Sequence, residues 1–180
     1  MSGNNSVRIS AGQWRSRLLR FPDAEGLRPT PDRVRQTVFN WLGQDLSGLT
    51  CLDLFAGTGV MGFESLSRGA QQVVMVESNR QVYQALNSNQ QALSAQQARI
   101  LHMDALQFLA SSSDRFDVIF LDPPYHQQWL AKLLPLMHDH LKPDGLLYVE
   151  AEHSVQDPEG WQVIKKGRAG HVMYHLLKAL

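Results

Sequence analysis

From residue 50 onward, short apolar runs alternate with stretches of helical periodicity. This alternation is typical of βαβ units, in which helices connect strands that run parallel in one sheet. Two further runs around Gly167 and Gly170 are expected to form a terminal antiparallel hairpin. The expected strands span residues 51–55, 72–77, 98–102, 116–121 and 145–150, the helices 60–67, 80–93, 105–110 and 128–140, and the hairpin strands 161–166 and 171–177. The sequence therefore predicts an α/β fold with a mostly parallel seven-stranded sheet.

Positive charge is concentrated at the start of the chain. The whole chain is neutral, with 17 basic and 17 acidic residues, but residues 1–40 hold seven arginines against three acids, a net charge of +4. The planar arginine fork suits phosphate groups and stacking on bases, so this segment is expected to face a polyanion rather than to be an ordinary solvated surface. The candidate nucleic-acid contacts are Arg8, Arg15, Arg17, Arg28, Arg33 and Arg35.

The N-terminal segment, residues 1–45, is distinct in pattern from the body, residues 46–180. Two short runs before residue 20 are expected to pair as a small Arg-rich hairpin. Thr30 and Pro31 indicate a helix start, with the Thr30 hydroxyl as cap and Pro31 at the first helical position. We expect this helix to cap the main sheet while the hairpin projects as an arm.

The composition narrows the cellular setting. The single cysteine, Cys51, excludes an internal disulfide and suits a reducing cytosol. No apolar run reaches the roughly 18 residues of a membrane span, and the N-terminus lacks the apolar core of a secretory signal. The histidines show no metal-ligand spacing. We therefore expect a cytoplasmic protein without a membrane span or a metal site.

A glycine-rich loop follows the first expected strand of the body. Gly57 and Gly59 allow the backbone to pass close to a ligand at a helix N-terminus, with Phe55 and Ala56 leading into the loop. The spacing also fits a dinucleotide motif. However, Asp53 lies inside the strand, where a carboxylate is costly unless it serves a ligand or a loop. An ammonium group suits this carboxylate better than a pyrophosphate, which favours S-adenosylmethionine as the cofactor.

Two more carboxylates follow the next strands. Glu77 ends the second strand and can accept both ribose hydroxyls. Asp104, followed by Ala105, comes after the third strand, where it can accept from an adenine amine, cap a helix, or do both. Because the carboxyl ends of parallel strands meet at one edge, these acids are expected at the edge where open α/β sheets bind ligands.

A stiff acidic and aromatic loop, Asp122-Pro123-Pro124-Tyr125, follows the fourth expected strand. An exocyclic amine on a nucleobase is a poor nucleophile, so its methylation needs acceptors aimed at the N–H groups and a surface that holds the ring. Asp122 supplies a side-chain acceptor, Pro123 a carbonyl on a backbone with fixed φ, and Tyr125 a stacking face. The alternative is a proline turn with a surface tyrosine.

Taken in chain order, these motifs resemble those of class I methyltransferases that act on amino groups. Residues 12–18, 26–42 and 62–70 closely resemble the bacterial RsmD family, and the similarity runs from about residue 7 to 178. The resemblance implies a Rossmann-like class I methyltransferase fold, S-adenosylmethionine as cofactor, and methylation of N2 of one guanine in 16S ribosomal RNA. We also expect a monomer that acts on the small ribosomal subunit or its assembly intermediate.

Other functions remain open from the sequence. The proline loop also permits methylation of adenine N6 in RNA or DNA, and a non-enzymatic Rossmann-type binding module is a third possibility. An NAD oxidoreductase is least favoured, because no second nucleotide-binding half is present. Only about 18 residues separate Tyr125 from Asp144, which leaves no room for a DNA-recognition domain and favours an RNA whose shape is already fixed.

Overall fold

The computed structural model describes residues 5–125 and 128–180. A seven-stranded sheet lies at its centre, in the order β5-β4-β3-β6-β7-β9-β8. Its parallel strands are β3 (Thr50–Asp53), β4 (Gln72–Glu77), β5 (Ala98–His102), β6 (Phe116–Leu121) and β7 (Leu141–Ala151). The terminal hairpin of β8 (Trp161–Ala169) and β9 (Val172–Ala179) is antiparallel. The predicted mostly parallel sheet with a C-terminal hairpin is confirmed.

Helices cover both faces of the sheet, which explains why its central strands are almost continuously apolar. One apolar core contains side chains of α1 (Asp32–Leu42), α2 (Val60–Ser67) and α3 (Arg80–Leu93). The second core, on the other face, contains side chains of α4 (Ala105–Ser111) and α5 (Trp129–Met137), and a short 3₁₀ helix (His138–His140) leads into β7. The structure therefore has three layers, with the sheet between two layers of helices.

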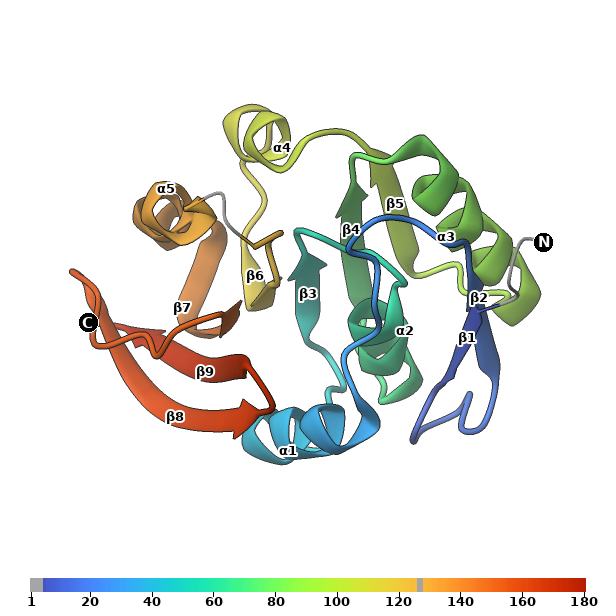
Figure 1. The fold of residues 1–180 in the computed structure, drawn as a ribbon, viewed down its shortest axis with the longest axis horizontal. Coiled ribbons are helices and arrows are strands. Elements are labelled where there is room, and N and C mark those ends of the chain that lie inside the picture. Colours follow the sequence, from blue (N-terminus) through green and yellow to red (C-terminus); the bar gives the residue numbers. More distant parts are fainter. Residues whose placement is uncertain (1–4, 126–127) are drawn as a thin grey trace.

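The N-terminal hairpin is packed against the body. Its strands β1 (Asn5–Arg8) and β2 (Leu18–Phe21) form a separate two-stranded sheet that lies beside α3 (Figure 1). Ile9, Trp14 and Leu19 are buried in the same apolar core as α2 and α3. The expectation that the hairpin projects freely is therefore wrong, because its apolar side chains complete a core that the body begins.

A buried carboxylate on α2 fastens the hairpin in place. Glu64 is fully buried, and both of its carboxylate oxygens accept a hydrogen bond from the backbone N–H of Ser10, at 3.1 and 2.9 Å. The same carboxylate pairs with Arg68 at 3.0 Å and with Arg35 of α1 at 3.6 Å. Three segments far apart in the sequence, the hairpin, α1 and α2, therefore meet at one charge.

The start of α1 differs from the sequence-based expectation. Pro31 occupies the N-cap position, and no side chain caps the helix. The hydroxyl of Thr30 instead donates a hydrogen bond to Glu150 Oε1 of β7, at 3.1 Å. Thr30 is buried, so its hydroxyl needs a partner inside the protein, and the long-range acceptor takes the place of the expected cap.

Gly12 offers a direct test of this docking. It has φ +84°, and a Cβ atom at this position would lie 1.8 Å from the carbonyl oxygen of Ser67 on α2. Gly26 has a similar φ of +73° but open space around it. We expect Gly26→Ala to lower the free energy of unfolding by about 1–2 kcal/mol, the cost of a left-handed backbone. Gly12→Ala should cost about 1–3 kcal/mol more, because the hairpin must also move away from α2.

Urea denaturation of the two variants measures this difference. Equal losses of stability in Gly12→Ala and Gly26→Ala would mean that the packing of the hairpin on α2 contributes nothing beyond the backbone conformation.

Candidate active site

A pocket lies where β3 and β6 are neighbours, at the carboxyl edge of the parallel strands. The chain proceeds from β3 toward one side of the sheet and from β6 toward the other, so this is the switch point at which open α/β sheets bind ligands. The strands and their loops contribute Asp53, Phe55, Gly57, Phe120, Asp122 and Tyr148 to its lining. Arg28 and Thr30 reach it from the segment that precedes α1.

The glycine-rich loop is held by a carboxylate and by packing. Gly57 lines the pocket with φ +54°, and its N–H donates to Glu77 Oε1 at 3.0 Å. The second oxygen of Glu77 accepts from the Asn79 N–H at 2.9 Å. Gly59 has φ +81° and lies so close to Phe63 that an added Cβ would clash with its ring. Glu77 therefore shapes the loop, and its ribose contact stays a prediction.

Of the other predicted cofactor residues, Phe55 and Ala56 line the pocket, whereas Asp104 and Ala105 are not among its lining residues. Asp104 caps α4, where its Oδ1 accepts a 2.8 Å hydrogen bond from the Leu106 N–H, and Ala105 is buried at the start of that helix. The capping role weighed from the sequence is therefore observed, and its adenine contact remains a prediction. Phe55 packs edge-on against Trp129 of α5, with ring centroids 5.3 Å apart, so α5 supports this side of the loop.

The proline loop, residues 122–125, begins at the same edge of the sheet, and its acidic residue contributes to the pocket. Asp122 lines the pocket and Pro123 is buried, whereas Pro124 and Tyr125 are exposed. Burial raises the pKa of Asp122 well above its ordinary value, and the negative charge and hydrogen bond of Glu150 raise it further. The pKa of Asp53 is also raised, first by burial and then by Glu77 and Glu150. The site therefore concentrates carboxyl groups that resist ionisation.

Glu150 was not among the residues predicted from the sequence. It lies near the end of β7, is 7% exposed, and accepts hydrogen bonds at Oε1 from the Tyr148 hydroxyl at 2.8 Å and from Thr30. Its carboxyl group also hydrogen-bonds that of Asp122. The sequence did contain a signal for this residue: Glu150, like Asp53 and Glu77, is a carboxylate at the end of a parallel strand.

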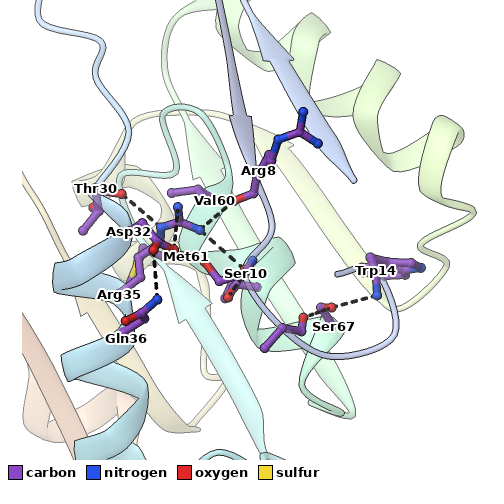
Figure 2. A network of polar contacts seen from close by, with 12 residues as sticks. Arg8, Ser10, Trp14, Thr30, Asp32, Arg35, Gln36, Val60, Met61 and Ser67 are labelled. Atoms are coloured by element: carbon purple, nitrogen blue, oxygen red, sulfur yellow. Dashed lines mark hydrogen bonds and ion pairs between the residues drawn. The ribbon is translucent and has the colours of Figure 1, made fainter. Parts of the chain in front are cut away.

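The structure separates the arginines proposed to contact nucleic acid. Arg8, Arg15, Arg17, Arg28 and Arg33 are exposed. Arg35 is only 3% exposed and donates to the carbonyl oxygens of Thr30 and Arg8, at 3.0 and 2.9 Å (Figure 2). The expectation that Arg35 contacts RNA is therefore wrong: its guanidinium joins α1 to the hairpin. Arg28 lies at the pocket, a location that its place in the Arg-rich segment did not indicate.

The donor and acceptor groups of the pocket fit S-adenosylmethionine better than a dinucleotide. Asp53 can accept from an ammonium group, and Arg28 can pair with a carboxylate. Glu77 does not line the pocket but holds its Gly57 loop. A pyrophosphate would add negative charge beside Asp53 and Asp122, whose pKa values are already raised. Within residues 5–125 and 128–180, no group of three His, Cys, Asp or Glu side chains could hold a metal ion. No helix in that part of the chain is long and apolar enough to cross a bilayer.

The strand order and the acids at the carboxyl edge define a class I methyltransferase fold. A solved structure described as a 16S rRNA N2-guanine methyltransferase from T. thermophilus, in complex with AdoMet and guanosine, shares this fold with a TM-score of 0.74 and 20% identity. That likeness covers 100% of this chain and 51% of the other. The solved structure of yhhF from Escherichia coli aligns with a TM-score of 0.87 and 39% identity, over 97% of this chain and 98% of that one.

Sequence comparison identifies the family. The sequence model of the family described as conserved hypothetical protein 95 matches residues 7–178. The Escherichia coli K12 protein named ribosomal RNA small subunit methyltransferase D is 41% identical over 182 residues, which cover 97% of this chain and 91% of that protein. The chain therefore belongs to this family, that of the RsmD methyltransferases.

The raised pKa of Asp122 predicts how stability depends on pH. The folded state holds a proton on this group at pH values where the unfolded chain, with a pKa near 4, has lost it. Stability from this group is therefore lost as pH rises from about 4 toward the folded pKa. We expect Asp122→Asn to raise the free energy of unfolding of the ligand-free protein, and to do so more at pH 8 than at pH 5, in urea denaturation.

Asp117 on the same strand is the matched control. Burial opposes its ionisation, but hydrogen bonds from Thr50 and Lys142 outweigh burial and lower its pKa. This group stabilises the fold above pH 4 and loses that effect as pH falls through its folded pKa. Asp117→Asn should therefore destabilise the protein at pH 8. The same sign of change in both variants would contradict the assignment of opposite environments.

Proposed function

We propose that this protein transfers a methyl group from S-adenosylmethionine to the exocyclic N2 of a guanine in 16S ribosomal RNA. Membership of the RsmD family supports methyl transfer, and the name of the Escherichia coli relative supports the ribosomal small subunit as the place of action. The observation that carries the proposal is that Asp122 lines the pocket while Tyr125, three residues further along the same loop, is exposed. This loop supports the proposal because it offers an acceptor at the pocket and an exposed aromatic ring that can stack on a base.

The residues of the proline loop hold the base and its amine. The guanine must leave its stack to enter the pocket, where the Tyr125 ring, 43% exposed, can stack on it. Asp122 and the Pro123 carbonyl can then accept the two amino hydrogens, which holds the nitrogen lone pair away from conjugation with the ring. S-adenosylmethionine supplies an electrophilic methyl group when bound. Most of the acceleration then comes from positioning and from exclusion of water.

The substrate is proposed to be the small ribosomal subunit or its assembly intermediate. The described protein is a small α/β body with a docked Arg-bearing hairpin, which suits an RNA whose shape is already fixed. Arg15 and Arg17 lie together on the connection between β1 and β2 and are exposed, as polyanion contacts require. A cytoplasmic location belongs to the same proposal, because bacterial ribosomes are assembled in the cytoplasm. We also propose that the protein is a monomer.

Variants of the proline loop test the catalytic assignment. Asp122→Ala should lower the single-turnover rate of methyl transfer by about 10²–10³, the typical loss for one preorganised hydrogen-bonding group, while S-adenosylhomocysteine still binds. Tyr125→Phe should be mild because the ring is retained, and Tyr125→Ala should be severe. The assay uses small subunits from a strain that lacks the methyltransferase, with mass spectrometry of the nucleosides.

Two results would contradict the proposal in different ways. Methyl groups found on adenine N6 would keep the enzyme class and replace the target base. Near-normal rates in Asp122→Ala would leave the proline loop as a structural turn.

The salt dependence of binding tests the hairpin arginines. Replacing Arg15 and Arg17 by Ala should reduce the slope of log K against log salt by about two, roughly one for each arginine that no longer binds a phosphate. The matched control replaces Lys165 and Lys166, an exposed pair on the edge strand β8. An equal change in the control pair would show that the effect reflects overall charge and not the hairpin surface.

A further inference from the structure

We propose that Asp122 and Glu150 share one proton, which they release when positively charged S-adenosylmethionine binds and regain from the target amine during methyl transfer. Glu150 is then a positioning residue that acts through Asp122. This inference rests on the proposed function, because the proton that returns to the pair is the one that the methylated amine must lose.

The strand register brings the two carboxyl groups together. Residues of the parallel strands β6 and β7 pair as Phe120 with Tyr148 and Leu121 with Val149. The next residues are Asp122, directly after the end of β6, and Glu150 of β7, and continuation of the register brings them side by side on the same face. This face also carries Phe120 and Tyr148, whose rings meet edge to face with centroids 6.0 Å apart. Asp122 faces the pocket, and Glu150 is buried behind it.

Two hydroxyl groups donate hydrogen bonds to the Glu150 carboxyl group. The Tyr148 hydroxyl donates to Oε1 at 2.8 Å, and the Thr30 hydroxyl donates to the same oxygen at 3.1 Å. Burial and the charge of Glu150 raise the pKa of Tyr148 well above its ordinary value, so the phenol keeps its proton and stays a donor. Because Oε1 of Glu150 already accepts two hydroxyl hydrogen bonds, we place the shared proton on Asp122, which donates it to Glu150.

The surroundings of the pair are acidic. Asp53 of β3 lines the same pocket as Asp122, its negative charge raises the pKa of Asp122, and Tyr174 of β9 is the register partner of Glu150. The nearby cations are Arg28, which lines the pocket, and Arg35, which is engaged with Glu64 and the Thr30 carbonyl. Two adjoining carboxylates in such a place cannot both be charged at low cost, so the ligand-free pair holds one proton. A positively charged ligand in the same pocket lowers the cost of charging both carboxyl groups.

The charges then balance through one catalytic cycle. The ligand-free pair carries one negative charge, and it carries two after losing its proton to water as the cationic cofactor binds. The amine lone pair forms the new N–C bond while the C–S bond breaks, and sulfur keeps the bonding electrons. The nitrogen is now cationic, and one of its protons passes to Asp122. The pair regains its single proton, the sulfur is neutral, and the site returns to its initial charge.

Binding of two ligands that differ by one charge tests this inference without any turnover. S-adenosylmethionine carries a sulfonium and S-adenosylhomocysteine a neutral sulfur. Calorimetry at pH 7.5 in buffers of different ionisation enthalpy measures the protons released by each ligand. We expect the wild type to release more protons with S-adenosylmethionine, by a difference approaching one. Its relative affinity for that ligand should therefore rise with pH by up to about tenfold per unit.

Variants test whether the proton released on S-adenosylmethionine binding comes from the Asp122–Glu150 pair. Glu150→Gln keeps the volume and the acceptor for Thr30 and Tyr148, but it removes the neighbouring charge, so the difference between the ligands should vanish. The control, Glu159→Gln, changes an exposed acid in the loop before β8 and should leave the difference in proton release between the two ligands unchanged. Tyr148→Phe removes one donor from Glu150 and should move the pH dependence of S-adenosylmethionine affinity to higher pH, which supplies a second readout if Glu150→Gln does not fold.

Each outcome is decisive. Equal proton release for both ligands in the wild type, or an unchanged difference in Glu150→Gln, would overturn the inference while leaving the proposed methyl transfer intact. Failure of the wild type to bind either ligand would instead overturn the proposed function.

Discussion

The buried charge of Glu64 is the constraint on which the arrangement of this protein depends. A fully buried carboxylate is tolerated only when charges and hydrogen-bond donors surround it, and here the donors come from the N-terminal hairpin, from α1 and from Arg68 just after α2. Arg35 also holds the Thr30 carbonyl. The same network therefore docks the hairpin and fixes the backbone at Thr30, in the segment that lines the pocket. It connects the surface proposed to bind RNA with the site proposed for methyl transfer.

The fold could be predicted from the sequence because its signals are local. Apolar runs of strand length, such as Phe116–Leu121, and the helical period of residues 80–93 each depend only on neighbouring residues. The acids of the pocket edge could be predicted for a related reason: in a parallel sheet, the ends of all strands lie at one edge, so chain position alone brings Asp53, Glu77 and Asp122 to the same side. Glu150, near the end of β7, follows the same rule.

The remaining features depend on contacts between segments far apart in the sequence. An arginine in a basic segment has the same sequence signal whether it faces solvent or a buried acid, so the burial of Arg35 against Glu64 could not be read from residues 1–40. A threonine before a proline is a good helix cap, yet the hydroxyl of Thr30 bonds a residue 120 positions away. In both cases the partner is decided by the packing of α1 on the sheet and not by local preference.

The shared core of the hairpin and the body has a consequence for how such enzymes can be modified. A recognition element joined by a flexible linker can be exchanged between relatives as a module, because neither part depends on the other for its folding. Here Ile9, Trp14 and Leu19 complete a core whose other half belongs to α2 and α3. Transplanting this hairpin onto another methyltransferase would therefore also require the matching surfaces of α2 and α3.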